Sequence, residues 1–393
     1  MTTLSRDVPR REASKCDEER LAWLALAPSP GLGPKRILDA MKQLGSPSRI
    51  FELTLTELEG LRFPAEPAQF IFDGNARGAA QEEWVHVEAQ GATIISFGCA
   101  EHPERLKEIY DPPPVLWVRG VVSLLSRPAI AVVGTRHPSP FGSGVAEMLA
   151  RNLAVRRLLI GSRMARGIDS CAHRGAMGAR MPTVAVWGTG IDVVYPKENK
   201  KLAEEILEVG GAILIEVPPG TFLTPQNFPR RNRILSRMSI AVLVVEAAEN
   251  SGTRVTSRCA AEQNRDLFAV PGNGTGANSW TPNTLIKQGA KLVATWEDVC
   301  EDLPSQVRLE REAEAHPESK TETTASILPD PVLRPQEAMV LELMRSDGSL
   351  QIDQILELLE TQLTSAEVFT AFFELEITGR IRCMRGKNCV PAL

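Results

Sequence analysis

The chain has 393 residues, of which 43% are apolar, and a formal net charge of −5. This length allows two or three domains with at least one sizeable core. The sequence has no run of about 18 apolar residues to cross a bilayer and no apolar segment behind its charged N-terminus, as a signal peptide requires. We therefore expect a globular, cytoplasmic protein without membrane contact.

Residues 17–90 are predicted to form a small N-terminal domain of short helices, of the SAM or helix-hairpin-helix type. At their centre, residues 30–35 read PGLGPK, which resembles a helix-hairpin-helix turn whose backbone N–H groups can contact a DNA phosphate. A plain connection between two helices accounts for the same residues, because only Lys35 and Arg36 add positive charge there.

Residues 91–303 are predicted to form an α/β domain. Six short apolar runs begin at intervals of 25 to 29 residues, which leaves room for one helix in each interval. A continuous apolar run is typical of a strand buried on both faces, so the pattern predicts a doubly wound, mostly parallel sheet. Residues 91–120 are expected to lead into it. The runs cover 129–134, 158–162, 183–188, 212–216, 241–247 and 267–270.

Glycine-rich and polar loops follow these runs. The carboxyl ends of parallel strands lie at one edge of a sheet, so the loops are expected to converge on one crevice. Neither GxGxxG nor GxxxxGK[ST] occurs, which excludes the usual dinucleotide and P-loop sites, and plain turn chemistry remains an alternative for each loop. The seven cysteines form no CxxC pair, so we expect no metal site and no cofactor. The loops are 134–136, 161–162, 188–190, 216–220 and 251–253.

Arginines are concentrated in two places. Arg230, Arg231, Arg233 and Arg237 have no acidic residue within 221–240, and residues 129–190 hold eight arginines, two acids and no lysine. We therefore expect the counter-charge to come from outside, from a phosphate backbone that guanidinium groups can bind bidentately. Pairing with acids from elsewhere in the chain is the alternative.

Residues 304–332 are expected to form an acidic flexible linker, and residues 333–393 a winged-helix-like domain. Helical patterns cover 335–345, 349–359 and 365–378, Thr364 and Glu367 have the spacing of a capping box, and a hairpin is expected after Arg380. The third helix is acidic, which favours docking to a protein over insertion into the DNA major groove.

Six ordered segments resemble the DNA-processing protein A (DprA or Smf) family. The resemblance implies an extended Rossmann-like domain that binds and protects single-stranded DNA, forms a homodimer and loads the RecA recombinase during natural transformation. It implies a binding protein without catalytic residues. The segments are AVVGTRHPSPFG (131–142), ARGIDSCAHRGAM (165–177), TVAVWGTGIDVVYP (183–196), FPRRNRILSRMS (228–239), VVEAAENSGTRVTSRCAAEQNRDLFAVPGN (244–273) and NTLIKQGAKLV (283–293).

The resemblance places a DNA pocket on particular residues. Guanidinium groups would neutralise phosphates, and Phe228 could stack on a base whatever its sequence. Phe228 could instead be a core residue, and Asn232 or Arg233 could hold the loop through backbone hydrogen bonds. The residues carried over by position are Arg136, Gly188, Thr189, Phe228, Arg230, Arg231, Asn232 and Arg233, and the predicted site also includes Ser162, Arg163, Arg166 and Thr253.

The sequence departs from the family pattern at three positions. Arg163 stands where members have glycine after the serine, Arg157 replaces a glycine before that strand, and Pro225 stands where a basic residue is common. We hypothesise that Arg163, Arg254 or Arg258 compensates for the lost phosphate contact.

The rival hypothesis is a nucleotide-hydrolysing enzyme related to the LOG-like phosphoribohydrolases. Their GGxGTxxE loop corresponds most nearly to residues 251–256, where Thr256 occupies the position of the catalytic glutamate. General acid/base chemistry there lacks its carboxylate. Asp169 and His173 could form a catalytic pair on a helix, although a buried structural role fits them better.

Overall fold

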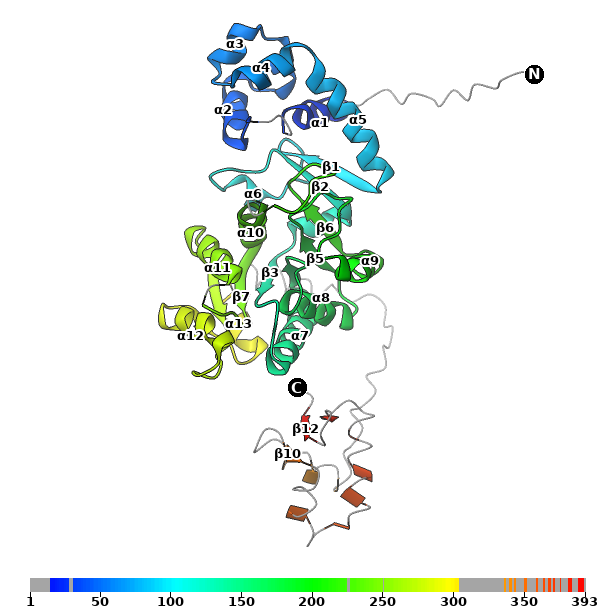
Figure 1. The fold of residues 1–393 in the computed structure, drawn as a ribbon, viewed down its shortest axis with the longest axis vertical. Coiled ribbons are helices and arrows are strands. Elements are labelled where there is room, and N and C mark those ends of the chain that lie inside the picture. The colour runs from blue at the N-terminus through cyan, green and yellow to red at the C-terminus, as the bar shows by residue number, and fades with distance from the viewer. Residues whose placement is uncertain are drawn as a thin grey trace, which may run out of the picture. The chain divides into compact units, whose positions relative to one another are not determined.

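The computed structural model describes residues 15–27, 31–224, 227–249 and 251–303, together with scattered residues between 336 and 391. The chain divides into two compact units, residues 1–315 and 316–393. The first contains a nine-stranded sheet with the strand order β1-β2-β6-β5-β4-β3-β7-β8-β9 (Figure 1).

Six of these strands are the predicted apolar runs, so the doubly wound, Rossmann-like sheet is confirmed. From the central strand β3 the chain proceeds outward to β6, then crosses back to β7 on the other side of β3, and all neighbouring pairs from β6 to β9 are parallel. The strands are β3 (Ala129–Val133), β4 (Leu159–Ser162), β5 (Thr183–Val186), β6 (Ala212–Ile215), β7 (Ser239–Val244), β8 (Asp266–Ala269) and the short β9 (Lys291–Leu292).

Residues 91–120, expected only as a lead-in, supply two further strands. β1 (Ala92–Ser96) pairs antiparallel with β2 (Val115–Gly120), and β2 pairs antiparallel with β6, with Trp117 opposite Ile215. Between them lies α6 (Glu104–Lys107), and η2 (Val122–Ser126) follows. The sheet is therefore mixed at this edge and parallel elsewhere.

Both faces of the parallel strands are covered by helices. Ile130 and Val132 pack with α7 and α8, whereas Ala131 and Val133 pack with α10 and α11. This alternation explains why the β3 run is apolar throughout, because successive side chains point to opposite faces. The helices are α7 (Pro140–Val155), α8 (Ile168–Gly178), α9 (Lys200–Glu208), α10 (Asn227–Met238), α11 (Gly252–Glu262), α12 (Trp280–Lys287) and α13 (Trp296–Glu301), with the short η3 (Lys197–Asn199) and η4 (Ala277–Ser279).

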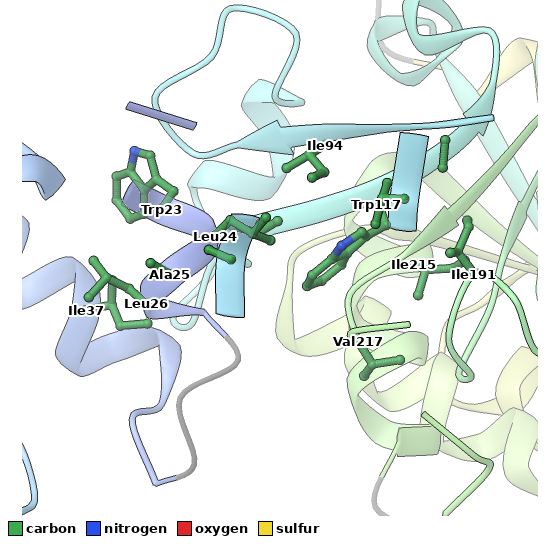
Figure 2. Close-up of a cluster of buried hydrophobic side chains, with 14 of the residues drawn as sticks. Trp23, Leu24, Ala25, Leu26, Ile37, Ile94, Trp117, Ile191, Ile215 and Val217 are labelled. Atoms are coloured by element: carbon green, nitrogen blue, oxygen red, sulfur yellow. The ribbon is translucent and has the colours of Figure 1, made fainter. Parts of the chain in front are cut away.

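The expected N-terminal helices share a hydrophobic cluster with the mixed edge of the sheet. Trp23 and Leu24 belong to the same cluster as Trp117 and Ile215 (Figure 2). Trp117 Nε1 also donates a hydrogen bond of 3.0 Å to Glu83 on α5. The helices are α1 (Lys15–Leu26), α2 (Pro34–Leu44), η1 (Pro47–Glu52), α3 (Leu55–Gly60), α4 (Ala65–Phe72) and α5 (Asn75–Ala89).

The second unit contains a small antiparallel sheet. β11 (Ile381–Cys383) and β12 (Asn388–Pro391) form the hairpin expected after Arg380. β10 (Leu350–Gln351) pairs with β12, so the prediction that the helix of 349–359 includes these two residues is wrong. Their backbone groups add a third strand to the hairpin.

Parts of the C-terminal predictions lie outside the described residues. Helical residues occur within each of the three predicted ranges, and Thr364 N donates to Glu367 Oε2 at 2.8 Å, as in a capping box. Most residues of the three helices and the whole linker at 304–332 are not described. The winged-helix-like fold and the linker therefore stay predictions.

Candidate nucleic-acid interface

A cavity of about 420 Å³ lies where β3, β4 and β7 end, beside the start of α10. Because the chain leaves β3 on one side and returns on the other, this is the topological switch point, where α/β sheets bind ligands. Of the five loops expected to converge here, 134–136 and 251–253 line the cavity, whereas no residue of 161–162, 188–190 or 216–220 is among the lining residues. The lining residues are Gly134, Thr135, Arg136, His137, Arg163, Ala165, Phe228, Pro229, Arg231, Asn232, Ser251, Gly252, Thr253 and Val255.

Two glycines allow the loops after β3 and β4 to pack against each other. A Cβ on Gly134 would lie 2.5 Å from Ile168 and 2.8 Å from the Glu246 carbonyl oxygen. Gly167 has φ +76°, and a Cβ there would lie 2.4 Å from the Thr135 carbonyl oxygen. Larger residues would separate the backbones that form the cavity wall.

An aromatic ring lies close to two guanidinium groups at the cavity. The Phe228 ring centroid is 5.6 Å from Cζ of Arg136 and 5.3 Å from Cζ of Arg231. Phe228 is half-buried and Arg136 is exposed, so Phe228 is not the core residue that the sequence left as an alternative. A flat apolar ring flanked by cations suits a nucleotide, which offers a base to stack and a phosphate to neutralise.

Arg231 is buried, and the described part of the chain places no carboxylate within 4.0 Å of it. It is 8% exposed, and burial, reinforced by the neighbouring Arg163, lowers its pKa to about 9. Its Nη2 donates to Asn232 Oδ1 at 3.5 Å, and its Nε is buried without an acceptor among the described residues. A buried cation is costly unless an anion accompanies it, so this group can bind a phosphate strongly.

Arg163 is held by the protein itself. Its Nε and Nη2 each donate to Asp169 at 3.0 Å, and further bonds of 3.3 Å reach Thr256 Oγ1 and the Gly134 carbonyl. Arg163 is 5% exposed. It therefore forms the floor of the cavity and joins the loops, with little donor capacity left for a ligand.

The proposed catalytic pair of Asp169 and His173 is not formed. Asp169 binds Arg163, while His173 Nδ1 lies 2.8 Å from Thr183 Oγ1. Burial lowers the pKa of His173 to about 4. Both residues are buried beneath the loops and hold the structure together, which was the interpretation that the sequence favoured.

The expectation that the four clustered arginines lack an internal counter-charge is wrong for two of them. Arg233 pairs with Glu216 and, at 3.3 Å, with Asp111. Arg237 pairs with Glu108 and donates to the carbonyl oxygens of Arg105 and Gln263 at 2.8 and 2.9 Å. Asp111 and Glu108 lie more than 100 positions earlier, and Glu216 lies 17 positions before Arg233, so all three fall outside the window 221–240.

The structure brings half of the predicted contact residues to the cavity. Arg136, Arg163, Phe228, Arg231, Asn232 and Thr253 line it. The other lining residues lie within two positions of these six along the chain, so including the adjoining residues of each segment would have found them. For all twelve residues, contact with a DNA strand stays a prediction.

The other six predicted residues do not line the cavity. They are Ser162, Arg166, Gly188, Thr189, Arg230 and Arg233. Ser162 Oγ and Thr189 Oγ1 each donate to a backbone carbonyl at 2.6 Å, and Arg166 pairs with Glu198. Arg230 is exposed and has no carboxylate within 4.0 Å in the described part of the chain.

The three arginines suggested as compensation for Pro225 all have partners within the protein. Besides Arg163, Arg254 donates to the Glu249 carbonyl at 3.2 Å, and Arg258 pairs with Glu262 at 2.8 Å. Their positions do not favour the compensation hypothesis. Pro225 lies outside the described residues.

Among the described residues, no group of three or more His, Cys, Asp or Glu side chains could hold a metal ion. No helix in that part of the chain is long and apolar enough to span a bilayer.

Residues 93–304 match the family model of DNA recombination-mediator protein A. The chain belongs to this family. The matched range extends from β1 to the end of α13 and includes every residue that lines the cavity. The sequence-based recognition of the DprA/Smf family is confirmed.

Individual relatives cover different shares of the chain. Protein Smf of Escherichia coli is 43% identical over 202 residues, which are 51% of this chain and about half (54%) of that protein. Protein Smf of Synechocystis is 30% identical over 401 positions, which cover 93% of this chain and 97% of that protein. The X-ray structure of DNA processing protein A from Streptococcus pneumoniae superposes with a TM-score of 0.61 at 32% identity, covering 73% of this chain and 97% of that one.

Proposed function

We propose that this member of the DNA recombination-mediator protein A family binds single-stranded DNA in the cavity. The observation that carries the proposal is the Phe228 ring beside both Arg136 and the buried Arg231, which has no carboxylate partner in the described residues. A backbone phosphate supplies the missing anion, and the ring stacks on an unpaired base. The family name and the relatives called DNA processing proteins support DNA as the ligand.

The recognition is expected to be independent of base sequence. Stacking on an aromatic side chain contributes about 1–3 kcal/mol per base and tolerates every base. Phosphate contacts carry no sequence information. In a duplex the bases are stacked on each other, so the ring favours a single strand.

We infer that the protein acts by binding and not by catalysis. Thr256 occupies the position of the LOG-like catalytic glutamate, and its hydroxyl accepts a hydrogen bond from Arg163. A hydroxyl in this setting cannot replace the missing carboxylate as a general acid/base.

On the family relationship we further propose a cytoplasmic homodimer whose subunits align their DNA sites. It protects incoming single strands and delivers them to the RecA recombinase during natural transformation. Co-purification of RecA tests this part separately. We expect RecA to co-purify with single strands bound by the unmodified protein, but not with single strands bound by a variant that cannot dimerise.

The test of DNA binding is a fluorescence anisotropy titration of labelled oligo(dT) and of a duplex at several salt concentrations. We expect tighter binding of oligo(dT) and a linear fall of log K with log salt concentration. Arg136→Ala is expected to reduce the slope by about 0.7, the value for one phosphate contact on a single strand.

Lys201→Ala is the matched control, because Lys201 on α9 also carries one positive charge but its side chain is 87% exposed and does not line the cavity. Its titration should match the unmodified protein. Preference for the duplex, or release of a base from a nucleoside monophosphate, would overturn the proposal in favour of the enzyme.

A further inference from the structure

A second cavity, of about 410 Å³, lies near the carboxyl ends of β7 and β8 and the start of α7. Its lining includes polar side chains and one aromatic ring. The residues that matter for its chemistry are Ser139, Phe141, Glu246, Asn273, Asn278 and Ser279. None of them lines the first cavity.

The two cavities share one wall, the segment that follows β3. Arg136 and His137 line the first cavity, and Ser139 and Phe141 line the second. The segment is fixed in place, because Asn278 Nδ2 donates to the His137 carbonyl at 3.0 Å and Ser139 N donates to Glu246 Oε2 at 2.8 Å. Ser139 follows Arg136 by three residues, so their Cα atoms are at most about 11 Å apart.

The second cavity has the opposite electrostatic character to the first. No lysine or arginine is among its described lining residues, and Glu246 carries a carboxylate, which also accepts a bond from Ser139 Oγ. A phosphate would therefore be repelled. Asparagine and serine side chains suit a neutral group that both donates and accepts hydrogen bonds.

An exposed ring stands at the second cavity. Phe141, at the start of α7, is 54% exposed although it is a large apolar side chain. The adjoining α7 residue Gly142 leaves space for the Glu246 carboxylate, because a Cβ there would lie 2.3 Å from its Cδ. A flat heterocycle with polar edges fits a site that combines an accessible ring with amide and hydroxyl groups.

We propose that the second cavity receives a nucleobase of the same strand whose phosphate binds at Arg136, with the base stacked on Phe141. This inference rests on the proposed function. The shared wall thus separates a phosphate site from a base site, and one nucleotide step places its two chemically different parts on opposite sides of it.

The experiment compares oligo(dT) with an abasic oligonucleotide of the same length, which keeps the phosphates and lacks the bases. The measured quantity is the ratio of the two affinities. Phe141→Ala is expected to lower this ratio by about 5- to 150-fold, the loss of one base–aromatic stack. It should leave the salt slope unchanged, because it removes no charge.

Three further variants distinguish the loss of the ring from the loss of apolar volume and from a general effect of removing an exposed phenylalanine. Phe141→Tyr keeps a ring and should retain the ratio, whereas Phe141→Leu keeps apolar volume without a ring and should behave like Phe141→Ala. Phe72→Ala is the matched control, because Phe72 is 53% exposed at the end of α4. It should match the unmodified protein.

The outcomes separate this inference from the proposed function. If the unmodified protein binds no single strand, the proposed function fails and the inference fails with it. If the strand binds but Phe141→Ala keeps the full ratio, or Phe141→Leu does, only the base site on Phe141 is overturned.

Discussion

At the scale of single residues, the cavity contains arginines of three kinds. Arg136 is exposed beside the ring, Arg231 is buried without a carboxylate partner among the described residues, and Arg163 is buried and fully engaged. Only the first two have guanidinium groups available to an anion. The number of arginines therefore overstates the capacity of the site for phosphates.

Arg231→Met tests whether the buried cation serves binding and not folding. We expect weaker binding of oligo(dT), while the free energy of unfolding stays within about 1 kcal/mol of the unmodified protein or rises, because an unpaired buried charge is removed. Chemical denaturation and anisotropy measure the two effects. A large loss of stability would show that the guanidinium is a structural anchor.

Asp169→Ala tests a buried arginine that does have a carboxylate partner, Arg163. It leaves the Arg163 guanidinium buried without its carboxylate, which costs about 3–5 kcal/mol of folding free energy. Asp169→Ala combined with Arg163→Met should recover most of this loss in urea denaturation. Asp266→Ala, which breaks an exposed pair with Lys291 at 3.5 Å, is the control and should cost about 0–1 kcal/mol.

Individual residues also show the limit of reading charge from sequence. The window around Arg233 and Arg237 contains no acid, yet both are paired with acids more than 100 positions earlier, Asp111 and Glu108. Ion pairing depends on which loops the fold places side by side. Arg136, in contrast, was found because its loop follows a predicted strand, and Phe228, on α10, was found through the resemblance of its segment to the family.

At the scale of elements, the strands that were predicted correctly are those buried on both faces of the sheet. The β3 run is apolar at every position because helices cover both faces. β1 and β2 were missed, since the stretch between them contains Pro112–Pro114 and a short helix that break up the pattern. One face of these strands packs with the N-terminal helices and the other belongs to the cluster that includes α10, which a local pattern does not reveal.

The contact between α5 and β2 predicts a pH-dependent stability. Burial raises the pKa of Glu83 to about 7 from 4.5. Between these values the folded state binds more protons than the unfolded chain, so the free energy of unfolding falls as the pH rises. The stabilising contribution of the protonated Glu83 carboxyl group is fully present below about pH 4.5 and is lost by about pH 7.

Glu83→Gln removes this titration and keeps an acceptor for Trp117 Nε1. We compare the change in the free energy of unfolding that the substitution causes at pH 8 and at pH 5. The variant should be stabilised relative to the unmodified protein by roughly 1–3 kcal/mol more at pH 8 than at pH 5. Glu82→Gln, at an exposed neighbouring position on α5, should show no such difference. Denaturant titrations at both pH values measure it, and equal effects for the two variants would refute the assignment.

At the scale of the whole molecule, the site belongs entirely to the first compact unit. The cavity-lining residues fall between Gly134 and Val255, and this unit comprises residues 1–315. A chain ending at Ala315 is therefore expected to bind oligo(dT) within about twofold of the full chain. Anisotropy measures the affinity, with circular dichroism as the control for folding, and a tenfold loss would assign a DNA contact to residues 316–393.

The hydrogen bond of 3.0 Å from Thr253 Oγ1 to the Gly134 carbonyl joins positions 119 apart in the chain. During synthesis, the chain must therefore emerge from the ribosome as far as α11 before the cavity-lining segments after β3 and at the start of α11 can come into contact. A nascent polypeptide that has emerged only as far as β6 lacks the α10 and α11 residues of the cavity lining, so the proposed binding site cannot be complete at that stage.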